Sequence, residues 1–222
     1  MKLEKLKIFL GDWYEPLSEF VTEDIVKNIN IAGQQYAKTK CYPPASQVFR
    51  AFTETPYSET KVVILGQDPY PNENATGLAF DCGTNRMSPS MVSIEKAYRS
   101  YDPNHFNTKI LDGRTHQWCK EGVLLLNTAL TVEKGKPNSH KHLWLDFTKI
   151  VIKALNRKDH IIYLLWGKEA QDFSVLVNPS HTILKAEHPV APRYQGREWN
   201  HGDFFNLTNK ILKEKGKQEI KW

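Results

Sequence analysis

The sequence predicts an α/β fold of three layers, in which helices cover both faces of a central parallel sheet. Four short apolar runs, each followed closely by small or polar residues, are typical of buried parallel strands. Helical stretches separate these runs, and strands that alternate with helices imply βαβ crossovers. A chain of 222 residues can bury one sizeable core, so we expect a single domain over residues 1–222.

The elements follow in chain order from these patterns. Residues 15–55 are expected to be helical segments, which residues 41–44 (CYPP) interrupt because proline and the residue before it resist the α conformation. Strands are expected at residues 61–65, 122–126, 160–166 and, with a weaker pattern, 181–185. Helices are expected at residues 90–100, 115–121, 143–156, 168–176 and 204–215.

Composition excludes several classes of protein. The sequence has no run of about 18 apolar residues, so we expect no membrane span, and its start lacks the apolar stretch of a secretion signal. The three cysteines have no CxxC or histidine spacing, which argues against a zinc site or a disulfide framework and fits a reducing cytoplasm. A net charge of +5 leans mildly toward a polyanionic partner.

Polar residues that follow the strands mark the candidate site. Gln67 and Asp68 come after the first run, Asn127 ends the second, Lys168 follows the third and His188 follows the fourth. In open α/β sheets ligands bind outside the carboxyl ends of the strands, so we expect these residues to meet at one place.

Each of these residues also has a purely structural interpretation. Two prolines hold Asp68 and Tyr70 rigidly, as a preorganised site requires, but an isolated Asp-Pro is more often a turn or a helix cap. Asn127 could cap the next element or recognise an amide edge such as that of a nucleobase. His188 could be a structural histidine or a donor to developing negative charge. Phe80 could belong to the core or stack on a base.

Cofactor motifs are missing from the sequence. It has no metal-ligand cluster and no glycine-rich phosphate loop, so we expect neither a metal nor a cofactor. A serine or cysteine paired with histidine as a nucleophile stays open, although no cysteine stands in a recognisable nucleophile context. Spacing alone therefore predicts an α/β enzyme with an Asp, Asn and His site.

Seven ordered motifs closely resemble those of the family 1 uracil-DNA glycosylases, from Leu10 to Trp222. They are YPPASQVF (42–49), KVVILGQDPY (61–70), GLAF (77–80), EGVLLLN (121–127), NSH (138–140), LLWG (164–167) and HP (188–189). The resemblance implies a four-stranded, largely parallel sheet flanked by helices, which agrees with the four runs counted above. It also implies a monomer that flips deoxyuridine out of DNA and cleaves its N-glycosidic bond without a cofactor, initiating base-excision repair.

The resemblance also implies the roles of the pocket residues. Asp68 matches the carboxylate that orients the attacking water and stabilises the cationic sugar, and His188 matches the donor to uracil O2. Asn127 matches the residue that pairs with uracil N3 and O4. Tyr70 matches the wall that excludes the methyl group of thymine, Phe80 the ring that stacks on uracil, and Gln67 a further pocket residue.

DNA contacts are expected from three further segments. Ser88, Pro89 and Ser90 stand where the family has a proline-rich loop ending in a phosphate-binding serine. Lys168 is a candidate phosphate contact by its charge, although a solvated surface lysine is an equal alternative. Pro192, Arg193 and Tyr194 stand in the loop that carries the leucine wedge of the family.

Three departures from the family pattern matter. Pro71 replaces the usual histidine after Tyr70, so we expect slower turnover than in a typical member. Val190 replaces a phosphate-binding hydroxyl in a loop that needs one inserted residue. Arg193 aligns with the leucine wedge, with Tyr194 beside it, and an arginine there predicts stronger salt dependence of DNA binding.

Two hypotheses of different classes follow. The leading one is an active uracil-DNA glycosylase. The other is a catalytically weak relative that binds DNA as a replication accessory protein, or that is a target of the DNA-mimicking inhibitor proteins of the family. The complete set of pocket residues favours the enzyme.

Overall fold

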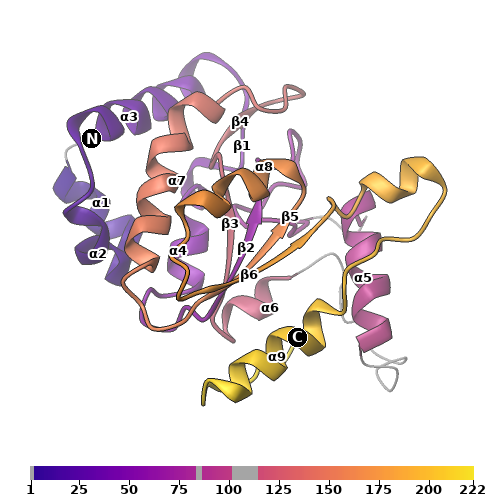
Figure 1. Cartoon of the computed structure of the whole chain (residues 1–222). Coiled ribbons are helices and arrows are strands. Elements are labelled where there is room, and N and C mark those ends of the chain that lie inside the picture. The colour runs from indigo at the N-terminus through magenta and orange to yellow at the C-terminus, as the bar shows by residue number, and fades with distance from the viewer. Residues whose placement is uncertain (1–2, 84–86, 102–114) are drawn as a thin grey trace.

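The protein is described by a computed structural model of the 222-residue chain, in which residues 3–83, 87–101 and 115–222 are described. A four-stranded sheet with the order β3-β2-β5-β6 forms its centre. The strands are β2 (Val62–Gly66), β3 (Val123–Asn127), β5 (Ile162–Trp166) and β6 (Thr182–Ala186). All three pairings are parallel, and helices lie on both sides of the sheet (Figure 1). The predicted α/β fold is confirmed, and this sheet is wholly parallel.

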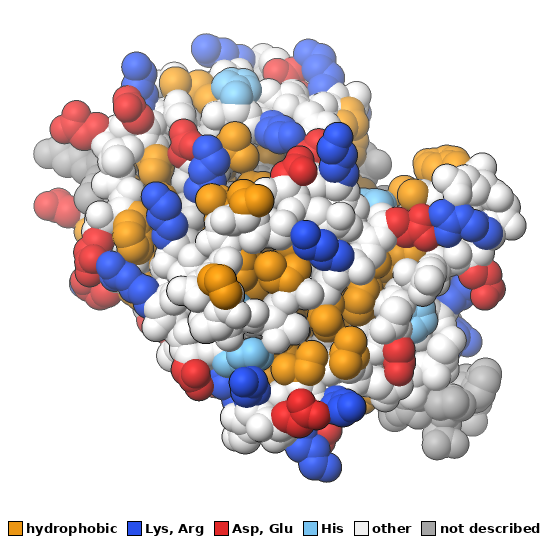
Figure 2. All heavy atoms as spheres, in the orientation of Figure 1, with side chains coloured by type: hydrophobic (Ala, Val, Ile, Leu, Met, Phe, Trp, Pro, Cys, Tyr) orange, Lys and Arg blue, Asp and Glu red, His pale blue; other side chains and the backbone are white. Residues whose placement is uncertain are grey.

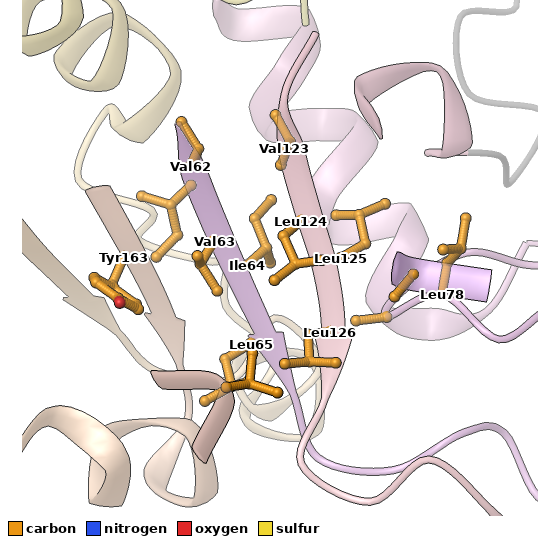
Figure 3. Close-up of a cluster of buried hydrophobic side chains, with 14 of the residues drawn as sticks. Val62, Val63, Ile64, Leu65, Leu78, Val123, Leu124, Leu125, Leu126 and Tyr163 are labelled. Atoms are coloured by element: carbon orange, nitrogen blue, oxygen red, sulfur yellow. The ribbon is translucent and has the colours of Figure 1, made fainter. Parts of the chain in front are cut away.

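The burial of each strand accounts for its sequence pattern. Every residue of β2, β3 and β5 is buried, which is why these strands are continuous apolar runs. Figure 3 shows the side chains of β2 and β3 packing together in this core. Strand β6 lies at the edge of the sheet and is only partly buried, which explains its weaker pattern.

Helices fill the two outer layers. In Figure 1, α7 with α3 beyond it lies to one side of the sheet, and α5, α6 and α9 lie to the other. The helices of the described ranges are α1 (Leu3–Leu10), α2 (Tyr14–Ser18), α3 (Glu23–Lys38), α4 (Arg50–Glu54), α5 (Pro89–Tyr101), α6 (His116–Cys119), α7 (Lys141–Leu155), α8 (Lys168–Gln171) and α9 (Phe204–Glu214). Short 3-10 turns are η1 (Gly11–Trp13), η2 (Ala45–Gln47), η4 (Asp172–Leu176) and η5 (Ala191–Gln195).

Helix α3 shows how the sequence specifies such an element. The Thr22 hydroxyl caps the helix by accepting the N–H of Ile25 at 3.4 Å. Ile25, Ile29 and Ala32 are buried at helical spacing, so one face of α3 packs inward. Thr39 ends the helix with an extended backbone.

Some local expectations differ from the structure. The helix expected at 115–121 spans four residues as α6, and the one expected at 168–176 divides into α8 and η4. A two-stranded antiparallel sheet of β1 (Cys41–Tyr42) and β4 (Val132–Glu133) was missed, because two-residue strands are too short to show a periodicity. The loop after β4 donates the Gly135 N–H to the Pro71 carbonyl at 2.9 Å, so it supports the segment after β2.

The outside of the molecule carries mixed charge. Basic and acidic side chains are interspersed over the face shown in Figure 2. In the described ranges, no helix combines the length and the apolar character that crossing a membrane requires. The three cysteines, Cys41, Cys82 and Cys119, are buried, and none of them forms a disulfide.

Candidate functional site

A pocket of about 520 Å³ lies at the carboxyl ends of the central strands. Its walls include all six residues predicted for catalysis and base recognition: Gln67, Asp68, Tyr70, Phe80, Asn127 and His188. They come from the segments that follow β2, β3 and β6, so the parallel sheet brings together residues far apart in the sequence. A larger cavity of about 1150 Å³ lies beside α9 and the end of the chain, but none of the described residues in its walls is a histidine.

Asp68 is held by two hydrogen bonds. Its Oδ2 accepts the backbone N–H of Asn138 at 2.7 Å, and its Oδ1 accepts Nε2 of Gln67 at 3.1 Å. Burial raises the pKa of the carboxyl group, and these hydrogen bonds oppose the rise. The carboxylate is thus fixed in orientation and partly withdrawn from water.

Asn127, the last residue of β3, lies against Gly66, the last residue of β2. A Cβ on Gly66 would come within 2.3 Å of the Asn127 Oδ1, so glycine is required for the carboxamide to lie there. The ends of β2 and β3 are joined directly, since the N–H of Thr128, just after β3, donates to the carbonyl of Gly66, the last residue of β2, at 2.9 Å. Asn127 is 5% exposed, which leaves little freedom for its side chain.

His188 is positioned as a neutral donor. Its Nδ1 accepts the N–H of Val190 at 3.3 Å, which assigns the ring proton of the neutral form to Nε2. Burial lowers the pKa of the imidazole, so the neutral form predominates near pH 7. Gly167 packs against His188. A Cβ on Gly167 would lie 2.9 Å from the His188 Cβ and 3.3 Å from the ring atom Cδ2.

The aromatic walls of the pocket are also fixed. The Tyr70 hydroxyl lies 2.6 Å from the Ser88 hydroxyl, and burial raises the pKa of Tyr70 to about 12. Phe80 has a left-handed backbone (φ 61°), and its ring lies 5.8 Å from His188 and 5.4 Å from Trp166 between centroids. Phe80 therefore belongs to the core and also lines the pocket, and stacking of its ring on a base stays a prediction.

The residues predicted to contact DNA are divided by the structure. Ser90 and Tyr194 line the pocket, and Tyr194 is 82% exposed. Ser88 is buried, and its hydroxyl caps α5 by accepting the Met91 N–H at 3.2 Å. Pro89 is exposed at the start of α5.

The wedge segment and Lys168 have separate surroundings. Arg193 lines a neighbouring groove with Lys96 and Arg197, whereas Tyr194, the next residue, lies at the pocket. Pro192 is buried. Lys168 is exposed at the start of α8 and is not part of the pocket wall.

Some pocket residues were missed by sequence reasoning. Leu78 and Pro137 line the pocket, and the Asn138 N–H holds Asp68. Asn138 and Leu78 belong to the quoted NSH and GLAF motifs, so these motifs were the available signal. A sequence pattern does not show which backbone N–H will donate to a side chain. The hydrogen bond from the Asn138 N–H to Asp68 was therefore not predicted.

Comparisons with known proteins show what this chain is similar to. Residues 52–213 match the family model of the uracil DNA glycosylase superfamily. The uracil-DNA glycosylase of Lachnoclostridium phytofermentans is 38% identical over 98% of both chains, and that of Sodalis glossinidius is 41% identical over 86% of both. Among solved structures, the mimivirus uracil-DNA glycosylase has a TM-score of 0.85 at 23% identity, covering 100% of this chain and 89% of its own. A Y322L variant of the mimivirus protein, solved in complex with UGI, has a TM-score of 0.86 at 24% identity, covering 100% of this chain and 91% of its own.

The family match spans most of the chain, and the curated relatives are similar along nearly its whole length. The strand ends that form the pocket at β2, β3 and β6 fall within the matched residues. On these grounds the chain belongs to the uracil DNA glycosylase superfamily.

Proposed function

We propose that the protein is a uracil-DNA glycosylase, which flips deoxyuridine out of DNA and hydrolyses the bond between uracil N1 and the sugar C1′. One observation carries this proposal. A carboxylate, a carboxamide and a neutral imidazole from three separate strand ends line one pocket with an aromatic wall, in a chain of this superfamily. The product is an abasic site, which initiates base-excision repair.

Asp68 supplies the negative charge for the reaction. As the N1–C1′ bond breaks, its electron pair leaves with uracil and the sugar becomes cationic. The carboxylate stabilises this cation and orients the water whose oxygen bonds to C1′, and a proton of that water passes to the carboxylate. A carboxylate is too weak a base to form hydroxide, so electrostatic stabilisation is its main contribution.

His188 acts at the other side of the base. Negative charge accumulates on uracil O2 as the base leaves, and the Nε2–H of the neutral ring donates a hydrogen bond to it. The Nδ1 contact with Val190 and the lowered pKa of His188 support this assignment. One well-aimed donor of this kind contributes roughly 3–4 kcal/mol to the transition state.

Three side chains select uracil. The Asn127 carboxamide pairs with N3–H and O4, and rejects cytosine because the cytosine edge has the opposite donor and acceptor pattern. Tyr70, fixed by Ser88, stands against C5 and excludes the thymine methyl group. Phe80 stacks on the base. Gln67 keeps Asp68 in orientation through its side-chain amide.

DNA lies across the mouth of this pocket. Ser90, at the pocket wall, and the exposed Lys168 are proposed phosphate contacts. Tyr194 is proposed as the wedge that fills the gap left by the flipped base, because it is exposed beside the pocket. Arg193 is proposed to contact phosphate from the neighbouring groove.

Other partners and the compartment follow from the same assignment. An inhibitor protein that mimics DNA, of the kind solved with the mimivirus protein, is proposed to compete for this face. We expect a monomer in the cytoplasm, and three buried cysteines without a disulfide agree with that reducing compartment.

The proposal is tested by release of uracil from an oligonucleotide that carries one deoxyuridine. We expect an abasic product in the presence of EDTA, and none from a matched oligonucleotide that carries thymine. Tight, salt-dependent DNA binding without any product would instead support the DNA-binding alternative.

A further inference from the structure

An ion pair between Lys141 and Glu169 joins two helices beside the pocket. Lys141 Nζ contacts Glu169 Oε2, and the side chains are 38% and 37% exposed. Lys141 begins α7, and Glu169 is the second residue of α8. An ion pair this exposed contributes little to folding stability, so stability alone does not account for it.

On the α7 side, the pair reaches the support of Asp68. The Lys141 N–H donates to the Asn138 carbonyl at 3.1 Å, which closes a tight turn in which Asn138 has a left-handed backbone (φ 65°). The N–H of the same Asn138 donates to Asp68 Oδ2 at 2.7 Å. Lys141 is therefore three residues from the backbone group that fixes the carboxylate.

On the α8 side, the pair reaches the support of His188. The Gly167 N–H, just before α8, donates to the Ala186 carbonyl at 2.9 Å, and Gln171 Nε2 donates to the same carbonyl at 2.6 Å. Ala186 ends β6, two residues before His188, and Gly167 packs against His188 itself. Movement of α8 would therefore be passed to the imidazole.

The pair also brings two opposite charges to Asp68. Burial is the largest influence on the carboxyl pKa, while Glu169 raises it and Lys141 lowers it. The other titratable groups of the pocket are His188, whose pKa burial lowers, and Tyr70, whose pKa lies at about 12. Near pH 7 both are neutral, and the charged side chains that act on the Asp68 carboxyl group within the described residues are Glu169 and Lys141, which lie outside the pocket wall.

We propose that the Lys141–Glu169 ion pair is a brace between the starts of α7 and α8 beside the pocket, which positions the Asp68 carboxylate relative to His188 and balances the charge around it. Lys141 and Glu169 are thus positioning residues for the reaction. This inference rests on the proposed function for its kinetic consequences, but its electrostatic consequence can be measured without catalysis.

The kinetic test compares Glu169→Gln with Lys141→Met. Loss of the negative charge stabilises the Asp68 carboxylate, so in Glu169→Gln the acid limb of the single-turnover pH profile moves to lower pH. Loss of the positive charge moves the limb to higher pH in Lys141→Met. Loss of the brace lowers the plateau rate in both variants by about tenfold, within the range expected when a reacting group is displaced by less than 1 Å. The substrate KM changes little.

Lys149→Met is the matched control. It removes another lysine of α7 that pairs with a carboxylate, Asp146, at 2.9 Å. Because this pair contacts neither the Asn138 turn nor α8, we expect the wild-type rate and pH profile.

A measurement independent of activity is the titration of Asp68 itself, by ¹³C NMR of protein labelled at aspartate carboxyl groups and assigned with Asp68→Asn. We expect the Asp68 pKa to move in opposite directions in Glu169→Gln and Lys141→Met. The proposal would be overturned if the Asp68 pKa were the same in wild type and both variants, or if it moved in the same direction in both variants. A wild type that releases no uracil contradicts the proposed function instead, and the NMR titration then still decides the inference.

Discussion

Replacing Gly66 by alanine tests how closely the pocket is built around Asn127. The added Cβ would lie 2.3 Å from the Asn127 Oδ1, whereas ordinary contact begins at 3.4 Å, so one of the two must move by about 1.1 Å. The same added Cβ would also lie 3.0 Å from the Ala79 Cβ, so it meets a second close neighbour. The carboxamide is therefore expected to move, and a displacement of about 1 Å can lower the rate of a reaction about 100-fold.

The assay is single-turnover uracil release by Gly66→Ala, with KM and thermal unfolding measured in parallel. We expect a loss of roughly 100-fold in rate and weaker discrimination between uracil and cytosine, because Asn127 reads the edge that distinguishes them. Gly33→Ala is the control, since an added Cβ there meets nothing within 4 Å in α3 and alanine favours a helix by about 1 kcal/mol. A Gly66→Ala protein with the wild-type rate and discrimination would refute this reasoning.

Four further outcomes follow from the structure. Pro71→His should raise the single-turnover rate, because it restores a donor to the pocket wall; an unchanged rate would show that Pro71 does not limit turnover. Tyr194→Ala should slow uracil excision from duplex DNA more than from single-stranded DNA. Arg193→Leu should mainly reduce the dependence of DNA affinity on salt concentration. If fluorescence titrations give wild type and Arg193→Leu the same dependence, the proposed phosphate contact of Arg193 is contradicted. Burial lowers the pKa of His181 below its ordinary value of 6.5, so the unfolded chain binds more protons and the free energy of unfolding should fall as pH drops below about 6.5. Chemical denaturation at pH 7.5 and 5.5 measures this fall, which should be smaller in His181→Asn than in the wild type.

The sequence predicted the sheet because burial leaves a direct trace in composition. Strands β2, β3 and β5 are buried at every residue, so each is a continuous apolar run, and the polar residues after them had to meet at one edge. The bounds of α6 and the small sheet of β1 and β4 were not predicted, because elements of two to four residues have no periodicity.

The pocket was predictable in its residues but not in its fine geometry. Asp68 and His188 were expected from strand ends and motifs. The Asn138 N–H that holds Asp68, and the Val190 N–H that sets the His188 tautomer, are backbone groups whose direction depends on tertiary structure. The division of Arg193 and Tyr194 between two cavities likewise follows from the η5 turn, which no residue pattern in the loop indicated.

Comparing wild type with Asp68→Asn tests the proposed chemistry most directly. Asparagine keeps the shape of the side chain but removes its charge, so DNA affinity should remain while uracil release in the presence of EDTA falls by about 100-fold or more. Retained affinity with lost release would support a carboxylate that stabilises the cationic sugar. Uracil release by Asp68→Asn at the wild-type rate would contradict it.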